Sequence, residues 1–150
     1  MSQNKQYAAE ILAILLQSSS KNREKFVGLD GIDALLQLLS QYRKRDPAKD
    51  SEEEEYVENL FDSLACIVDD DAGKEKFIEA EGIELAQIML RESKFSKPRA
   101  LKILDHALGG AGGGPACERL VEAAGLGTIF GMFMKKARIW HSSPDYSAQG

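Results

Sequence analysis

The stretch EKFIEAEGI at residues 75–83 recurs as ERLVEAAGL at residues 118–126, an offset of 43 residues. A third version, EKFVGLDGI, occupies residues 24–32 and is displaced by 51 residues, because a longer connection follows it. A unit that recurs at such a period is typical of solenoid proteins, in which each unit buries its apolar face against the next one. The sequence therefore predicts stacked repeats.

The 43-residue offset extends outside the quoted stretch, because it also pairs Leu60 with Ile103 and Asp62 with Asp105. Apolar residues recur at i, i+3, i+4 and i+7 in each copy, which is the pattern of a helix packed against a core. We expect three helices per copy. Long helices are predicted near residues 7–18, 56–68 and 98–108, short helices around Phe26, Phe77 and Leu120, and third helices over residues 32–39, 83–90 and 126–133. Each short helix ends near a recurring glycine, which permits a sharp turn and a positive φ at the corner.

These patterns divide the chain into three regions. Residues 1–6 are expected to be disordered, residues 7–136 to form the repeats, and residues 137–150 to be a disordered or adventitious tail. The repeats are placed at residues 7–50, 51–97 and 98–136. Residues 43–55 read as a charged loop that leads into a helix, where Ser51 and Glu54 fit a capping box. The glycine-rich run at residues 109–115 is expected to be a flexible connection.

The repeat resembles the armadillo repeat, and more specifically the beta-catenin-like protein 1 family of nuclear armadillo-type proteins associated with the spliceosome. The strings that carry the resemblance are ILAILLQ (11–17), LDGIDALLQLLS (29–40), ENLFDSLA (58–65), EGIELAQIMLRE (81–92), ALKILDHAL (100–108) and GLGTIFGMFMKK (125–136). They span roughly residues 7 to 136.

The resemblance implies an all-α, right-handed superhelix of about three three-helix repeats, located in the nucleus. It also implies a scaffold in pre-mRNA splicing that recognises basic, nuclear-localisation-like segments of partner splicing factors. Family members extend further at both ends, so the chain is expected to be a middle section, and its tail departs from the family pattern. Importin-type armadillo proteins grip basic peptides with a Trp and Asn ladder, but here the three long helices contain no Trp and Asn59 as their sole Asn.

Composition narrows the classes of function. The net charge is −5, which argues against duplex nucleic acid as the main partner, because phosphate binding needs a clustered basic surface. Cys66 and Cys117 lie far apart in the sequence and read as reduced core thiols of an intracellular protein rather than as a disulfide or a metal-binding pair. The polar N-terminus does not read as a signal peptide, and no apolar run is long enough to span a bilayer.

Asp62 and Asp105 are the main candidates for partner binding. They occupy equivalent positions on the helices that armadillo folds turn toward their groove, and stacking places them roughly 10 Å apart, given the spacing of packed helices. Two such carboxylates suit successive Lys or Arg residues of an extended peptide. Otherwise each aspartate caps a neighbouring helix or pairs with a local base.

Asn59 and Asp69 are secondary candidates for the same surface. Asp69 begins an acidic run of three residues that lacks the spacing of a calcium loop, so it reads either as solvated or as steering basic partners. His106 and His141 belong to no set of three or four zinc ligands. No nucleophile-elbow or phosphate-loop motif is present, so we expect neither an enzyme nor a cofactor.

Three functional interpretations follow. A protein-interaction scaffold fits the repeats and the acidity best. An RNA-contacting subunit would use the short basic clusters Arg43-Lys44-Arg45 and Lys135-Lys136. A structural fragment without binding of its own is the third. In every case the first and last repeats are expected to expose apolar faces, which favours marginal stability or self-association through those ends.

Overall fold

The computed structural model describes residues 2–123, 127, 130, 131 and 134, and every regular element in this part of the chain is helical. The α-helices are α1 (Gln3–Ser18), α2 (Ser20–Gly28), α3 (Gly31–Ser40), α4 (Glu52–Val68), α5 (Asp71–Glu79), α6 (Gly82–Glu92), α7 (Ser96–Leu108) and α8 (Gly114–Glu122), with a 3₁₀ turn, η1 (Ala111–Gly113), before α8. The all-α prediction is confirmed. The helix expected over residues 126–133 lies largely outside the described residues.

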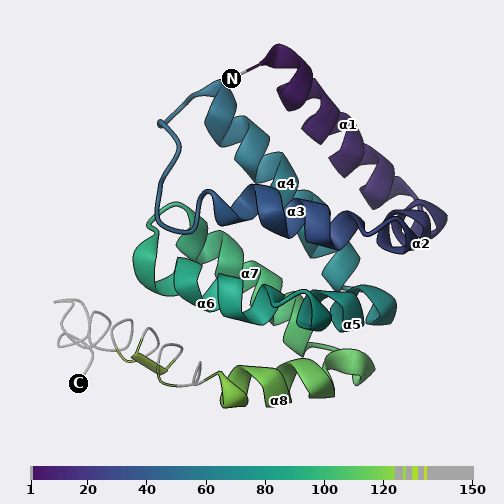
Figure 1. The fold of residues 1–150 in the computed structure, drawn as a ribbon, viewed down its shortest axis with the longest axis vertical. Helices are drawn as coiled ribbons and strands as arrows, with labels where there is room; N and C mark the ends of the chain where they lie inside the picture. The colour runs from purple at the N-terminus through teal and green to yellow at the C-terminus, as the bar shows by residue number, and fades with distance from the viewer. Residues whose placement is uncertain (1, 124–126, 128–129, 132–133, 135–150) are drawn as a thin grey trace, which may run out of the picture.

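The helices succeed one another along the molecule in the order of the repeats (Figure 1). The long helices α1, α4 and α7 pack in series, with α4 between the other two. Each is followed by a short helix, α2, α5 or α8, and then α3 and α6 complete the first two repeats. Figure 1 shows α3 in front of α4 and α6 in front of α7. Side-by-side stacking of a tandem unit is therefore present.

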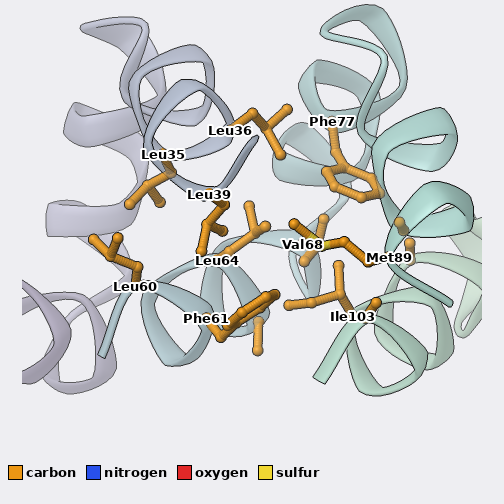
Figure 2. Packing of buried hydrophobic residues seen from close by; sticks show 14 of the residues in the cluster. Leu35, Leu36, Leu39, Leu60, Phe61, Leu64, Val68, Phe77, Met89 and Ile103 are labelled. Carbon is orange, nitrogen blue, oxygen red and sulfur yellow. The ribbon is translucent and has the colours of Figure 1, made fainter. Parts of the chain in front are cut away.

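One continuous apolar core joins the repeats. Leu39, Leu64 and Ile103 come from three different helices and are at most 2 % exposed, and Figure 2 shows them together with Phe61 and Met89. No repeat has a separate core of its own, because a single buried cluster extends from Ala9 on α1 to Leu120 on α8. This is the packing that a solenoid requires.

At one position that recurs in each repeat, a side-chain donor contacts a backbone carbonyl near the C-terminal end of the preceding long helix. Arg23 donates to the carbonyl of Leu16 at 2.9 Å, and Lys74 donates through Nζ to the carbonyl of Asp69 at 2.7 Å. At the same position in the third repeat, the Cys117 thiol lies 3.8 Å from the carbonyl of Leu108. Because the last carbonyls of a helix have no partner within it, these side chains cap successive long helices. Cys117 is exposed and Cys66 is only partly buried, so the prediction that both are core thiols is wrong.

The recurring glycine is required for packing space. A Cβ atom on Gly82 would overlap the ring of Phe77, and one on Gly31 would overlap the ring of Phe26. The expected positive φ occurs one residue earlier, at Glu81 (62°) in the second repeat. The first repeat has the same αL conformation, at Asp30. The corner therefore uses an acidic residue for the turn and the glycine for close approach.

Two boundary predictions are wrong. Residues 3–6, expected to be disordered, form the first turn of α1, because this helix packs along α4 and Gln6 hydrogen-bonds to Glu55. The glycine-rich run at residues 109–115, expected to be flexible, contains η1 and the first turn of α8. A Cβ atom on Gly113 would overlap the carbonyl of Leu108, so this glycine permits a tight corner. The expected tail, residues 137–150, lies outside the described residues.

The capping box at the start of α4 forms with one difference. Ser51 Oγ accepts a hydrogen bond from the backbone N–H of Glu54 at 3.2 Å, as predicted. The carboxylate of Glu54 accepts from the N–H of Asp50, at 2.5 Å, instead of from Ser51 itself. Asp50 has a φ of 57°, which turns its N–H toward the helix.

No helix in the described part of the chain is long and apolar enough to cross a membrane.

Candidate functional site

The long helices leave an open hollow of about 410 Å³ between α1, α4 and α7, which we call the α1–α4–α7 groove. Most of its lining residues are of polar or charged types, and they come from four helices and one loop: Gln17, Arg23, Asp62, Ala65, Cys66, Asp69, Asp70, Lys102 and His106. A second hollow of about 440 Å³ continues along α4 and α7, from Asp62 toward Pro98. The repeat stacking therefore places charged side chains from several repeats along one surface.

Two ion pairs and one hydrogen bond join α4 and the residue after it to α7, and we call this set the α4–α7 seam. Glu58 pairs with Arg99, and Asp62 Oδ1 lies 3.9 Å from Lys102 Nζ. Asp69 Oδ1 lies 3.1 Å from His106 Nδ1. The Asp62–Lys102 pair is long, and both side chains are at least half exposed, so we expect it to contribute little to stability.

Asp69 and Asp70 follow the end of α4, and each contacts a different basic side chain that lines the hollow. The hydrogen bond from His106 holds the pKa of the Asp69 carboxyl below its usual value. Asp70 Oδ2 is 2.6 Å from Arg23 Nε, which links α2 to the α4–α5 corner. Each acid at this end of the groove thus already has a basic partner within the chain.

The predicted binding residues have different surroundings. Asp62 lies in the seam beside Lys102, which is the local pairing stated as its alternative. Asp69, predicted to be solvated or to steer basic partners, lies in the seam beside His106. Asp105 is exposed on α7 and forms no ion pair with the described residues. Asn59 is half-buried on α4. Asp62 and Asp105 do lie on neighbouring stacked helices, since Lys102 on α7 reaches Asp62.

Sequence reasoning missed the basic half of the seam. Arg99, Lys102 and His106 are spaced at i, i+3 and i+7 on α7, so they share one helix face, which is the face that meets the acids of α4. That spacing in the sequence would have been sufficient to predict a basic face on α7. The partner of each base was not readable, because the 43-residue offset aligns repeats without giving the stagger between neighbouring helices.

The hollow has the chemistry of a binding surface. Burial raises the pKa of the Cys66 thiol, so it is protonated at neutral pH and is a poor nucleophile. No group of three His, Cys, Asp or Glu side chains within the described part of the chain is arranged to hold a metal ion. What the surface offers is charged and hydrogen-bonding groups spread over three successive helices.

Tandem three-helix units, one shared core and a polar groove along the long helices define an armadillo-type repeat protein. The family model described as "Catenin-beta-like, Arm-motif containing nuclear" matches residues 1–149, and the chain belongs to this family. The match includes residues 137–149, where the sequence patterns had indicated a departure from the family. The predicted nuclear location is confirmed at the level of the family.

Relatives share nearly half of the residues. The chain is 48% identical to beta-catenin-like protein 1 of Homo sapiens and of Bos taurus, over 135 residues, which is 90% of this chain. It is 46% identical, over the same length, to the beta-catenin-like protein 1 homolog of Schizosaccharomyces pombe. The chain spans about a quarter of the length of these relatives, since the aligned part is 24% of each.

Proposed function

We propose that this protein is a non-catalytic scaffold whose α1–α4–α7 groove binds basic segments of partner proteins. The observation that supports it is the acidic part of the groove lining, with Asp62 on α4 and Asp69 after it, together with the exposed Asp105 at the position on α7 that is equivalent to Asp62. An extended peptide places successive side chains along such a series. The partner's Lys or Arg residues would contact these carboxylates one repeat at a time.

The internal ion pairs set the strength of this binding. A partner arginine that reaches Asp62 competes with Lys102, whose Nζ is 3.9 Å away and whose side chain is 60% exposed. Exposed pairs of this kind are worth about 0–1 kcal/mol, so a bidentate arginine replaces the lysine at little cost. Asp105 has no described pair to break. We therefore expect moderate affinity that decreases with added salt.

Replacing both acids tests the proposal directly. In the variant Asp62→Ala/Asp105→Ala, binding of a labelled peptide with a Lys- and Arg-rich segment is expected to weaken about tenfold, since two charge-assisted contacts are lost. The variant Lys102→Ala is expected to act in the opposite direction and to tighten binding about threefold, because it frees Asp62. Fluorescence anisotropy at low ionic strength measures both effects.

A matched control distinguishes binding at the groove from attraction by the overall negative charge of the protein. Asp33 and Glu75 are exposed on α3 and α5, and neither forms an ion pair with the described residues. Asp33→Ala/Glu75→Ala changes the net charge by the same amount and is expected to leave peptide affinity within about twofold. Equal losses in the two double variants, or no loss in either, would reject the groove as the binding surface.

We further propose the setting that the family resemblance implies. The three repeats then form part of a longer right-handed superhelix, and the partners are splicing factors with nuclear-localisation-like segments. Asp105 lies on the last long helix described here, so a following repeat would supply its basic neighbour in the way that Lys102 serves Asp62. A pull-down of this chain from nuclear extract, followed by mass spectrometry, tests the partner class.

We also propose self-association through the first repeat. The side of α1 facing away from the core carries Tyr7, Ile11, Ile14 and Leu15, which are 48–57% exposed. Their spacing follows one face of the helix, and the absence of charges between Glu10 and Lys21 leaves that face apolar. Such a face is unstable in water unless another surface covers it.

The variant Ile11→Lys tests this contact. Wild-type protein is expected to form dimers or larger species with rising concentration in sedimentation velocity, and Ile11→Lys to weaken that association about tenfold, because a lysine would be buried in an apolar contact. Leu29→Lys is the matched control, since Leu29 is 74% exposed on a different helix end. A wild type that stays monomeric at all concentrations would contradict the proposal.

A further inference from the structure

The connection between α3 and α4 is fixed to the next repeat. Asp46 Oδ1 accepts hydrogen bonds from Ser93 Oγ at 2.8 Å and from the backbone N–H of Phe95 at 3.2 Å. Ser96 Oγ, fully buried, donates to the carbonyl of Tyr42 at 3.1 Å. In Figure 1 this connection runs along the edge of the molecule beside the turn between α6 and α7. Two segments about fifty residues apart in sequence are thereby held together.

This contact gathers positive charge on an acidic protein. Residues 41–50 and 91–99 contain eight Lys and Arg but three Asp and Glu, whereas the whole chain has 19 and 24. The excess of five positive charges (eight minus three) contrasts with a net charge of −5 for the chain. Since neither segment is more than moderately basic alone, the cluster depends on the tertiary contact.

Six of these eight cations form no ion pair with the residues that the structure describes. Arg45 pairs with Glu53 at 2.5 Å, and Arg99 pairs with Glu58. Of the other six, Lys49 and Arg91 lie at outer ends of the two segments in the sequence, and we call the remaining four the basic edge: Arg43, Lys44, Lys94 and Lys97. Of the acids in the two segments, Asp46 is engaged in the contact itself, while Asp50 ends the first segment and Glu92 is near the start of the second.

The side chains in and beside the basic edge favour a protein ligand over RNA. Single-stranded RNA binding relies on exposed aromatic rings for base stacking, but the guanidinium of Arg99 covers the ring of Phe95 at 3.7 Å and Tyr42 is buried. Phosphate-backbone binding draws on many cations, and four supply little affinity at physiological salt. A short run of carboxylates needs few contacts, each a charge-assisted hydrogen bond.

We propose that the basic edge binds an acidic segment of a partner protein, at a surface separate from the α1–α4–α7 groove. The cations from the α3–α4 connection and from the α6–α7 turn engage the same run of Asp or Glu side chains. One molecule would then hold a basic partner segment in its groove and an acidic one at its edge. This inference does not depend on the groove binding peptides.

The test uses the full chain and a labelled peptide of alternating glutamate and serine. The variant Lys44→Glu/Lys94→Glu reverses one charge in each segment. It is expected to weaken binding of this peptide by about tenfold or more, because one charge-assisted contact is lost from each segment. Lys21 and Lys25 are exposed on α2, away from the edge, and Lys21→Glu/Lys25→Glu makes the same change in net charge. This control is expected to stay within about twofold of wild type.

Each remaining outcome overturns the inference. Equal losses in the two variants would indicate attraction by overall charge and no defined surface. A labelled oligouridylate of the same length that binds more tightly than the peptide, and that loses affinity in the Lys44→Glu/Lys94→Glu variant alone, would assign the edge to RNA. No binding of the peptide by wild type at low salt would reject an acidic ligand. Circular dichroism confirms that both variants fold.

Discussion

Replacement of Phe77 by alanine is expected to lower the free energy of unfolding by about 3–5 kcal/mol, the range for removing a large buried aromatic side chain. Phe77 is 1% exposed and lies between two repeats, where its ring packs on Gly82 and shares an apolar space with Leu39 and Ile103. Because native domains are stable by about 5–15 kcal/mol, this loss is a large share of the total. Urea denaturation followed by circular dichroism measures it.

Two controls separate the loss of burial from the loss of an aromatic ring. The third repeat has Leu120 at the equivalent position, 4% exposed, so Phe77→Leu is expected to cost less than about 1.5 kcal/mol. Phe26 fills the same place in the first repeat but is partly exposed, so Phe26→Ala should cost clearly less than Phe77→Ala. Equal costs for Phe26→Ala and Phe77→Ala would mean that the deeper burial of Phe77 does not account for its contribution to stability.

The second large effect is expected at Gly73, in the first turn of α5. A Cβ atom there would overlap the backbone carbonyl of Ile67 at the end of α4, and a backbone atom cannot move aside as a flexible side chain can. Gly73→Ala is therefore expected to destabilise the protein by about 1–3 kcal/mol, although alanine is the better helix former. Gly113 makes a similarly close approach to the backbone carbonyl of Leu108 at the end of α7.

Gly28 provides a control with the opposite sign. It also lies in a helix, but nothing is within 4 Å of its added Cβ atom. Gly28→Ala is expected to stabilise the protein by up to about 1 kcal/mol, because the unfolded chain loses freedom while the folded state has room for the methyl group. Thermal or urea unfolding of both variants measures the difference. If Gly73→Ala were neutral or stabilising, the tight α4–α5 corner would be wrong.

The sequence by itself determined the helices and their stacking. Recurrence of EKFIEAEGI and the i, i+3, i+4, i+7 spacing were sufficient, because helix periodicity is local and each repeat must bury the same face. Long helices near residues 7–18, 56–68 and 98–108 appear as α1, α4 and α7. The resemblance to the beta-catenin-like family rested on the same local strings, and the family match supports it.

Tertiary structure decided which charges meet. The sequence placed Asp62 and Asp105 at equivalent positions, but only the stagger of α7 against α4 puts Lys102 beside Asp62 and leaves Asp105 without a described partner. In the same way, the basic edge exists because Asp46 bonds to Ser93. Repeat periodicity determines which face each side chain occupies, whereas ion pairing depends on distances between helices and loops, which no local pattern encodes.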